Sequence, residues 1–104
     1  MQSPDVPAVK DAAWSAHPVD RHLLAKMEAR GLRPSGDADA RTVLRRLSFL
    51  LTGLPPRAEE TELFLREWET MPQARCVERA VDRLMASPRF GERFARHWLD
   101  LVRY

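Results

Sequence analysis

Residues 41–56 read RTVLRRLSFLLTGLPP, and this stretch decides the fold class. Its apolar residues recur at steps of one, three and four, which is the spacing of a helix with one buried side. Gly53 supplies a left-handed end, and the Pro55-Pro56 pair prevents the helix from continuing. The stretch therefore predicts an amphipathic helix that starts near Asp37 or Asp39 and ends at Thr52.

Similar signals outside this stretch predict four more helices. Pro18 fits a first helical turn, Gly31 ends that helix, and Met71-Pro72 breaks another. Ser87 followed by proline is a good N-cap for the last helix. The predicted ranges are 18–30, 58–69, 73–86 and 88–104.

The alternating pattern of a strand is absent from the sequence, so we predict an all-α fold, a compact array of about five short helices. Residues 1–16 hold two prolines and one large aromatic residue, Trp14, and predict an extended arm that this ring anchors. The predicted division is an arm at residues 1–16 and a helical domain at residues 17–104.

Composition narrows the function classes. The chain has 104 residues and a net charge of +2, and it contains no apolar run long enough to cross a membrane. The first residues do not have the pattern of a secretory signal peptide. The acidic helix predicted after Pro55-Pro56 does not suit a DNA groove, so we expect no nucleic-acid partner.

Cysteine and histidine usage limits metal and haem chemistry. Cys76 is the single cysteine, so neither an internal disulfide nor a covalent haem attachment is possible in this sequence. It lies beside the apolar side of its predicted helix and is interpreted as an inert packing residue. The three histidines lack the spacing of a zinc site, and we expect no metal or cofactor in this chain.

The last predicted helix carries the candidate site. Phe90, Phe94, Trp98 and Leu101 fall on one broad apolar side when residues are placed at 100° intervals. A polar stripe borders that side. Its members are Arg93, His97, Asp100 and Tyr104.

Two interpretations of the stripe stay open. In the functional one, Asp100 orients His97 as an acid–base group or ligand, Tyr104 extends the stripe, and Arg93 or Arg103 binds an anion. In the structural one, the aspartate satisfies a boundary histidine and the tyrosine ring packs. A single His-x-x-Asp on a helix favours the structural interpretation, because helical spacing produces it often by chance.

Several blocks of the sequence, in order, resemble the planctomycete cytochrome-associated domain of unknown function numbered 1549. The blocks are Val6–Trp14, Pro18–Asp20, Leu24–Lys26, Glu28–Leu32, Arg41–Leu47, Leu51–Pro56, Val81–Leu84, Ala86–Arg93, Ala95–Asp100 and Arg103-Tyr104. Leu50 stands where that family usually has an acidic residue, and Phe94 stands where it usually has tryptophan. Family members also continue with a glycine-bearing segment after the Arg-Tyr pair, so the chain is expected to be the front part of a longer domain.

The resemblance implies the kind of parent protein and its location, and it does not specify a reaction. It implies large exported multidomain proteins, with an extracytoplasmic location at the periplasm or cell surface. It also implies a neighbouring domain that holds haem c, and a link to polysaccharide breakdown or surface redox chemistry. No catalytic residues carry over from the family, and the walls of any site around His97, Asp100 and Arg103 are expected in further sequence.

Three functional hypotheses follow. The first is a helical module without catalysis of its own that packs against other domains of a longer parent or against a partner protein. The second is part of a hydrolytic or redox site on the last helix. The third is a docking surface for a c-type cytochrome domain, formed by the basic last helix.

Overall fold

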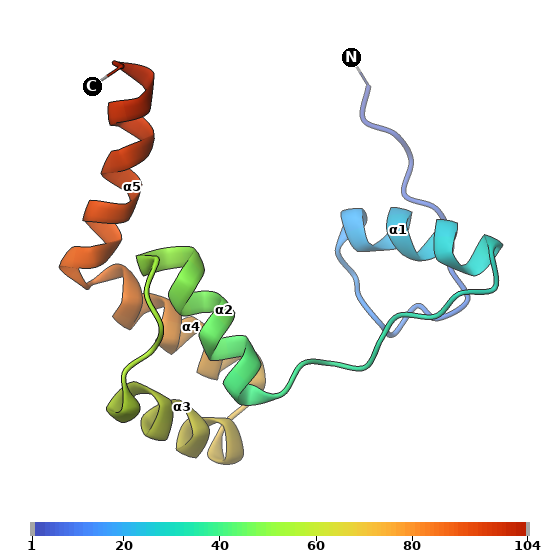
Figure 1. Cartoon of the computed structure of the whole chain (residues 1–104). Coiled ribbons are helices and arrows are strands. Elements are labelled where there is room, and N and C mark those ends of the chain that lie inside the picture. The colour runs from blue at the N-terminus through green and yellow to red at the C-terminus, as the bar shows by residue number, and fades with distance from the viewer. Residues whose placement is uncertain (1, 104) are drawn as a thin grey trace. The chain divides into compact units, whose positions relative to one another are not determined.

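A computed structural model describes residues 2–103, and five α-helices form its regular structure (Figure 1). This confirms the all-α prediction, and each observed helix end lies within one turn of its predicted position. The predicted end of the last helix, Tyr104, lies outside the described residues. The helices are α1 (Pro18–Ala29), α2 (Ala40–Thr52), α3 (Ala58–Thr70), α4 (Gln73–Met85) and α5 (Pro88–Leu101).

The chain divides into two compact units, residues 1–37 and residues 38–104. The first unit contains α1 together with the segment predicted as an arm, residues 1–16, in which residues 2–16 form no helix. The second unit contains α2 to α5. Whether residues 17–104 act as one domain, as the sequence suggested, stays a prediction.

Polar contacts hold the arm on α1 within the first unit. The backbone N–H groups of Lys10 and Asp11 donate to the Glu28 carboxylate at 3.0–3.1 Å. These two hydrogen bonds lower the pKa of Glu28. The Arg21 side chain donates to the Ala12 and Ser15 carbonyls. Backbone amides and carbonyls therefore anchor the arm.

In the first unit, apolar contacts contribute less to anchoring the arm than the sequence suggested. Leu24 of α1 is its buried hydrophobic residue among those described, whereas Trp14, the predicted anchor, stays 38% exposed. Trp14 and Leu24 line the same cavity in the first unit. The ring is thus a partial anchor beside the hydrogen bonds.

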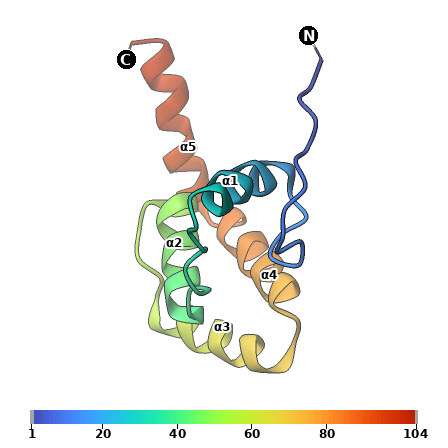
Figure 2. The ribbon, with the colours of Figure 1, turned by 90° about the vertical axis from the view of Figure 1, so that its right-hand side faces the viewer.

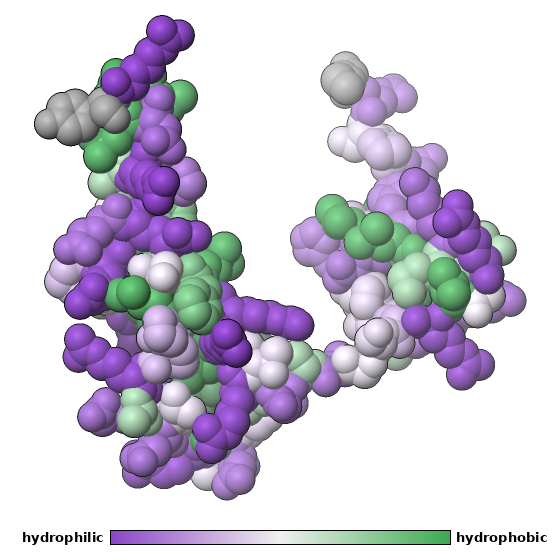
Figure 3. Space-filling model, in the orientation of Figure 1, coloured by the Kyte–Doolittle hydropathy of each residue, from purple (hydrophilic) through white to green (hydrophobic). Residues whose placement is uncertain are grey.

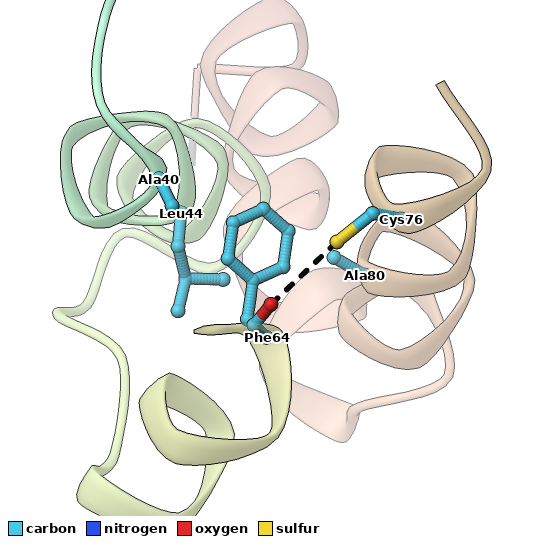
Figure 4. Packing of buried hydrophobic residues seen from close by; sticks show 5 residues of the cluster. All are labelled: Ala40, Leu44, Phe64, Cys76 and Ala80. Carbon is cyan, nitrogen blue, oxygen red and sulfur yellow. Dashed lines mark hydrogen bonds between the residues drawn. The ribbon is translucent and has the colours of Figure 1, made fainter. Parts of the chain in front are cut away.

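The second unit has a small core at the meeting of α2, α3 and α4 (Figure 4). Phe64 of α3 lies between Leu44 of α2 and Cys76 of α4, and the Cys76 thiol donates to the Phe64 carbonyl at 3.6 Å. Cys76 is fully buried, and burial raises the pKa of its thiol. A buried thiol with a raised pKa is a poor nucleophile, in agreement with the packing interpretation.

An ionic cluster joins α3 to α4 beside this core. The Arg83 side chain of α4 lies 3.0 Å from Glu60 and 3.3 Å from Glu67, and Arg79 lies 3.2 Å from Glu67. The Glu67 side chain is only 7% exposed. Two arginines from the next helix therefore compensate a carboxylate that has been removed from water.

Side-chain caps begin the second and fifth helices where the sequence predicts them. The Asp39 carboxylate accepts a hydrogen bond from the Thr42 N–H at 2.8 Å, and the Ser87 hydroxyl accepts one from the Arg89 N–H. Gly53 ends α2 in the left-handed conformation at φ 72°. Asp39 and Ser87 accept hydrogen bonds from backbone N–H groups that the start of a helix leaves without partners. Gly53 adopts the left-handed conformation that commonly ends a helix.

The fifth helix differs from the others because it contains no buried residue. It contacts α2 and α4 near its beginning, and Figures 1 and 2 both show it extending beyond α2, α3 and α4. In residues 2–103, no helix has the length and apolar character needed to cross a membrane.

Candidate functional surface

The projecting part of α5 exposes large apolar side chains to water. Trp98, Leu101 and Val102 are 73%, 74% and 70% exposed, and Phe94 is 38% exposed. At 100° per residue these four lie on the same side of the helix. We call them the apolar side of α5, and Figure 3 shows hydrophobic surface on this part of the helix. Contiguous exposed apolar residues of this kind are typical of interaction sites.

Phe90 and Phe94 connect this side to the rest of the unit. Their ring centroids lie 4.6 Å apart, and Phe90 is half-buried. The apolar side thus begins at the partly buried base of α5 and becomes more exposed along the helix. A second protein that covered this side would remove the exposed Trp98, Leu101 and Val102 side chains from water, whereas Leu99, which is 43% exposed, would stay outside the covered side.

The opposite side of α5 is charged and rich in arginine. The segment 88–103 contains four arginines and two acidic residues. The arginines are Arg89, Arg93, Arg96 and Arg103, and the acids are Glu92 and Asp100. The net charge of the helix surface is therefore positive, and any partner that extends past the apolar side meets this charge.

His97 and Asp100 do not form the oriented pair that the functional interpretation requires. Both are exposed, and no hydrogen bond or ion pair connects them in residues 2–103. The His97 ring instead contacts Phe94 edge-on, with centroids 5.5 Å apart. Tyr104, the last member of the predicted stripe, lies outside the described residues. The histidine therefore borders the apolar side of α5 and is not held by the aspartate.

Arg93 has a structural partner that the sequence did not reveal. Its Nε donates to the Leu50 carbonyl in the last turn of α2 at 3.1 Å. Its side chain also lies against Gly53, where an added Cβ would stand 3.3 Å from the Arg93 Cδ. Arg93 thus joins α5 to the end of α2 and satisfies a carbonyl that the helix leaves free.

The two predicted anion-binding arginines do not share a site. Arg93 and Arg103 are ten positions apart, which is about 15 Å along an α-helix. Arg103 follows α5 at a positive φ of 57° and is exposed. The prediction names Arg93 or Arg103 as the anion-binding residue, and it stays a prediction for each of the two arginines separately.

In the part of the chain that the structure describes, histidine, cysteine and carboxylate side chains do not form a cluster of metal-binding type elsewhere. Within the described part of the chain, no group of three or more could hold a metal ion. The Nδ1 of His17 accepts the N–H of Val19 and caps α1. The described residues of the candidate surface are therefore apolar and basic in character.

Comparison with protein families gives a match over most of the chain. Residues 18–104 match the PSCyt2 family model, which is described as a protein of unknown function (DUF1549). No curated protein and no solved structure matches the chain.

Proposed function

The chain belongs to the PSCyt2 family, a family of unknown function (DUF1549), and on that premise we propose that it is a helical interaction module without catalysis of its own. In this proposal, the apolar side of α5 packs against a partner domain. The observation that carries this proposal is the exposure of Trp98, Leu101 and Val102 on a helix without a buried residue. Burying such side chains is the main source of free energy in protein association.

The charge of α5 selects the chemistry of the partner. Four arginines against two acids favour a partner whose docking surface is apolar at its centre and acidic at its rim. A second copy of the same chain would place arginine-rich surfaces together, and like charges oppose that arrangement. The occupant of the apolar side is therefore an acidic, amphipathic helix or helical domain.

A defined peptide tests this surface directly. The probe is a fluorescein-labelled amphipathic helix with leucine on one side and glutamate on the other, titrated with the full chain by fluorescence anisotropy. Trp98→Gln is expected to weaken binding at least about tenfold, because a central exposed tryptophan is a typical hot spot. Trp14→Gln is the matched control, since it removes the same side chain from the first unit and should leave the affinity unchanged.

Three results would contradict the proposal. The peptide could fail to bind, or the two tryptophan variants could lose affinity equally. Sedimentation could also show that the chain forms a dimer which Trp98→Gln dissociates, and the occupant would then be a second copy.

The arginine excess on α5 favours a second candidate, which is docking of a c-type cytochrome domain in an exported parent protein. Such an interaction would rest on charge, and exposed charges are screened within about 10 Å at 0.1 M salt. Raising NaCl from about 0.1 M to 0.5 M should abolish binding of an acidic c-type cytochrome. Affinity for that cytochrome that survives the added salt would eliminate charge-led docking.

The exposed positions of His97 and Asp100 give less support to a hydrolytic or redox site on α5. A general base works within hydrogen-bond reach of the groups that orient it, and the described part of the chain supplies no such partner to His97. An enzymatic role would therefore depend on residues that a further domain contributes.

A further inference from the structure

A second pocket lies inside the unit formed by residues 38–104. Its volume is about 520 Å³, and residues from α2, α3, α4 and α5 line it together with the loop between α2 and α3. Ligand sites in proteins commonly measure about 300–1,000 Å³. The pocket does not involve the apolar side of α5, so its function is separate from the one proposed above.

A buried hydroxyl without a partner lies in the wall of this pocket. Ser48 of α2 is 1% exposed, and its Oγ has no hydrogen-bond partner among residues 2–103. Leaving a buried hydroxyl without a hydrogen bond destabilises the folded chain, because the hydroxyl loses its bonds to water and gains none in return. Buried polar atoms are nearly always paired with protein, water or ligand, so this one indicates that the pocket holds a polar group.

Arginines give the same pocket a positive charge. Arg57, Arg83 and Arg89 line it, against a single acid, Glu60. The Arg83 charge is balanced by Glu60 and Glu67, and its Nη2 lies 3.0 Å from the Glu60 Oε1. Arg57 and Arg89 are exposed and form no ion pair with any residue in the described range.

The beginning of α3 adds backbone donors at the same place. Its N-cap residue is Arg57, whose side chain makes no capping hydrogen bond. The first N–H groups of a helix without a cap favour an anionic acceptor. The first turn of α3, which also carries Glu59 and Glu60, therefore contributes backbone N–H groups beside the pocket, where Arg57 and Glu60 form part of the lining.

The remaining wall is mostly apolar. Its apolar residues are Leu54, Pro55, Pro56, Leu84 and Pro88, and the hydroxyl residues Thr52 and Ser87 lie among them in the lining. An inorganic anion such as phosphate would leave this wall without contacts. A ligand with one anionic group and a short apolar body would use both parts of the pocket.

We propose that this pocket binds an organic carboxylate, with the carboxylate toward the arginines and Ser48 and its apolar body against the leucine and proline wall. Two sources supply this chemistry. One is a small free acid, and the other is the carboxyl end of a peptide. Arginine recognises both through paired hydrogen bonds to the planar carboxylate.

Benzoate is the first probe, and benzamide is its neutral counterpart of the same shape. Each is titrated into the ¹⁵N-labelled full chain, with the Ser48, Thr52 and Leu84 amide signals followed by NMR. We expect saturable shifts with benzoate at a Kd of about 1 mM, and binding of benzamide at least about tenfold weaker. Equal affinity for the two probes, or no saturable shift, would overturn the proposal.

Arginine variants test the residues. Arg57→Gln and Arg89→Gln should each weaken benzoate binding several-fold, because each removes one cation without touching the Arg83 cluster. Arg66→Gln is the matched control, since Arg66 is an exposed arginine of α3 that does not line the pocket. Equal losses in all three variants would show that only overall charge attracts benzoate, and the site would be rejected.

Ser48→Ala separates the ligand role from a folding role. The variant should fold with an unchanged or higher Tm and bind benzoate more weakly, because alanine removes the unpaired hydroxyl. Full affinity in this variant would exclude Ser48 from the site.

A final titration distinguishes the sources of the carboxylate. N-acetyl-glycyl-phenylalanine is compared with its carboxamide and with benzoate. Tighter binding of the dipeptide acid than of benzoate assigns the pocket to a peptide terminus, and the reverse order assigns it to a small free acid. Binding of the carboxamide as tightly as the acid would overturn carboxylate recognition.

Discussion

Phe64 is the largest fully buried side chain of the second unit, and its ring centroid lies 5.5 Å from that of Trp68. Phe64→Ala is expected to lower the free energy of unfolding by about 3–5 kcal/mol, because it leaves a cavity between three helices. Urea denaturation followed by circular dichroism measures the change. Phe94→Ala, the same substitution on partly exposed α5, should cost less than about 1 kcal/mol. Similar losses in both variants would contradict this placement of the core.

His97 provides the second prediction at the residue scale. Because the ring is exposed and bonded to no described residue, His97→Ala should change the free energy of unfolding by no more than about 0.5 kcal/mol. Thermal denaturation provides the measurement. A loss of several kcal/mol would restore the interpretation of a satisfied boundary histidine. An unchanged Tm leaves His97 available for a role at the α5 surface.

Single residues show where sequence reasoning reached its limit. Ser87 and Cys76 were correctly interpreted because a cap and a packing residue depend on their own helix. The role of Arg93 could not be predicted from the sequence, because its acceptor, the Leu50 carbonyl, is 43 positions away. No sequence pattern around Ser48 marks it as functional, and only the assembled unit shows that its hydroxyl is buried and unpaired among the described residues.

Glu67 joins two elements and tests how much the ionic cluster stabilises them. Glu67→Gln should lower the free energy of unfolding by about 1–3 kcal/mol, because Arg79 and Arg83 then lose a buried charged acceptor. Chemical denaturation measures this change in the free energy of unfolding. Glu62→Gln serves as the control, because Glu62 is an exposed residue of α3. If the two variants are equally stable, the cluster contributes no more than a surface ion pair.

Asp39 makes the stability of α2 depend on pH. The hydrogen bond from the Thr42 N–H lowers the pKa of this carboxylate in the folded chain. Its stabilising effect is therefore complete above the unfolded pKa of about 3.9 and is lost as the pH falls through the lower folded value. The stability difference between the natural chain and Asp39→Ala should be large at pH 7 and should disappear in acid. Denaturation at several pH values tests this, and Asp37→Ala should show no such difference.

Helix bounds were predictable because their signals are local. Pro18, Gly53, Pro72 and Ser87-Pro88 act on the backbone within a few residues, and the observed ends lie beside them. Which acidic residues would be buried was not predictable, since Glu67 belongs to an acid-rich helix that resembles a solvated surface. Its burial depends on arginines that α4 brings to it.

The two units are expected to differ in stability at the scale of the whole molecule. The second unit has a core of five buried apolar residues, whereas the first has Leu24 alone among the described residues. A chain that lacks residues 1–37 should therefore keep the main thermal transition of the full chain. Hydrogen exchange should show lower protection in α1 than in α2, α3 and α4. A Tm that falls steeply on removal of residues 1–37 would mean that the two units fold as one.

Cys76 gives the molecule a natural reporter of its own opening. The chain has one sulfhydryl, and it is sealed between α3 and α4. A disulfide reagent such as Ellman's reagent can reach this thiol only when those helices separate. The labelling rate therefore reports how often the core opens. That rate can be read without adding a dye or altering a residue, and it allows every variant described above to be ranked on one kinetic scale.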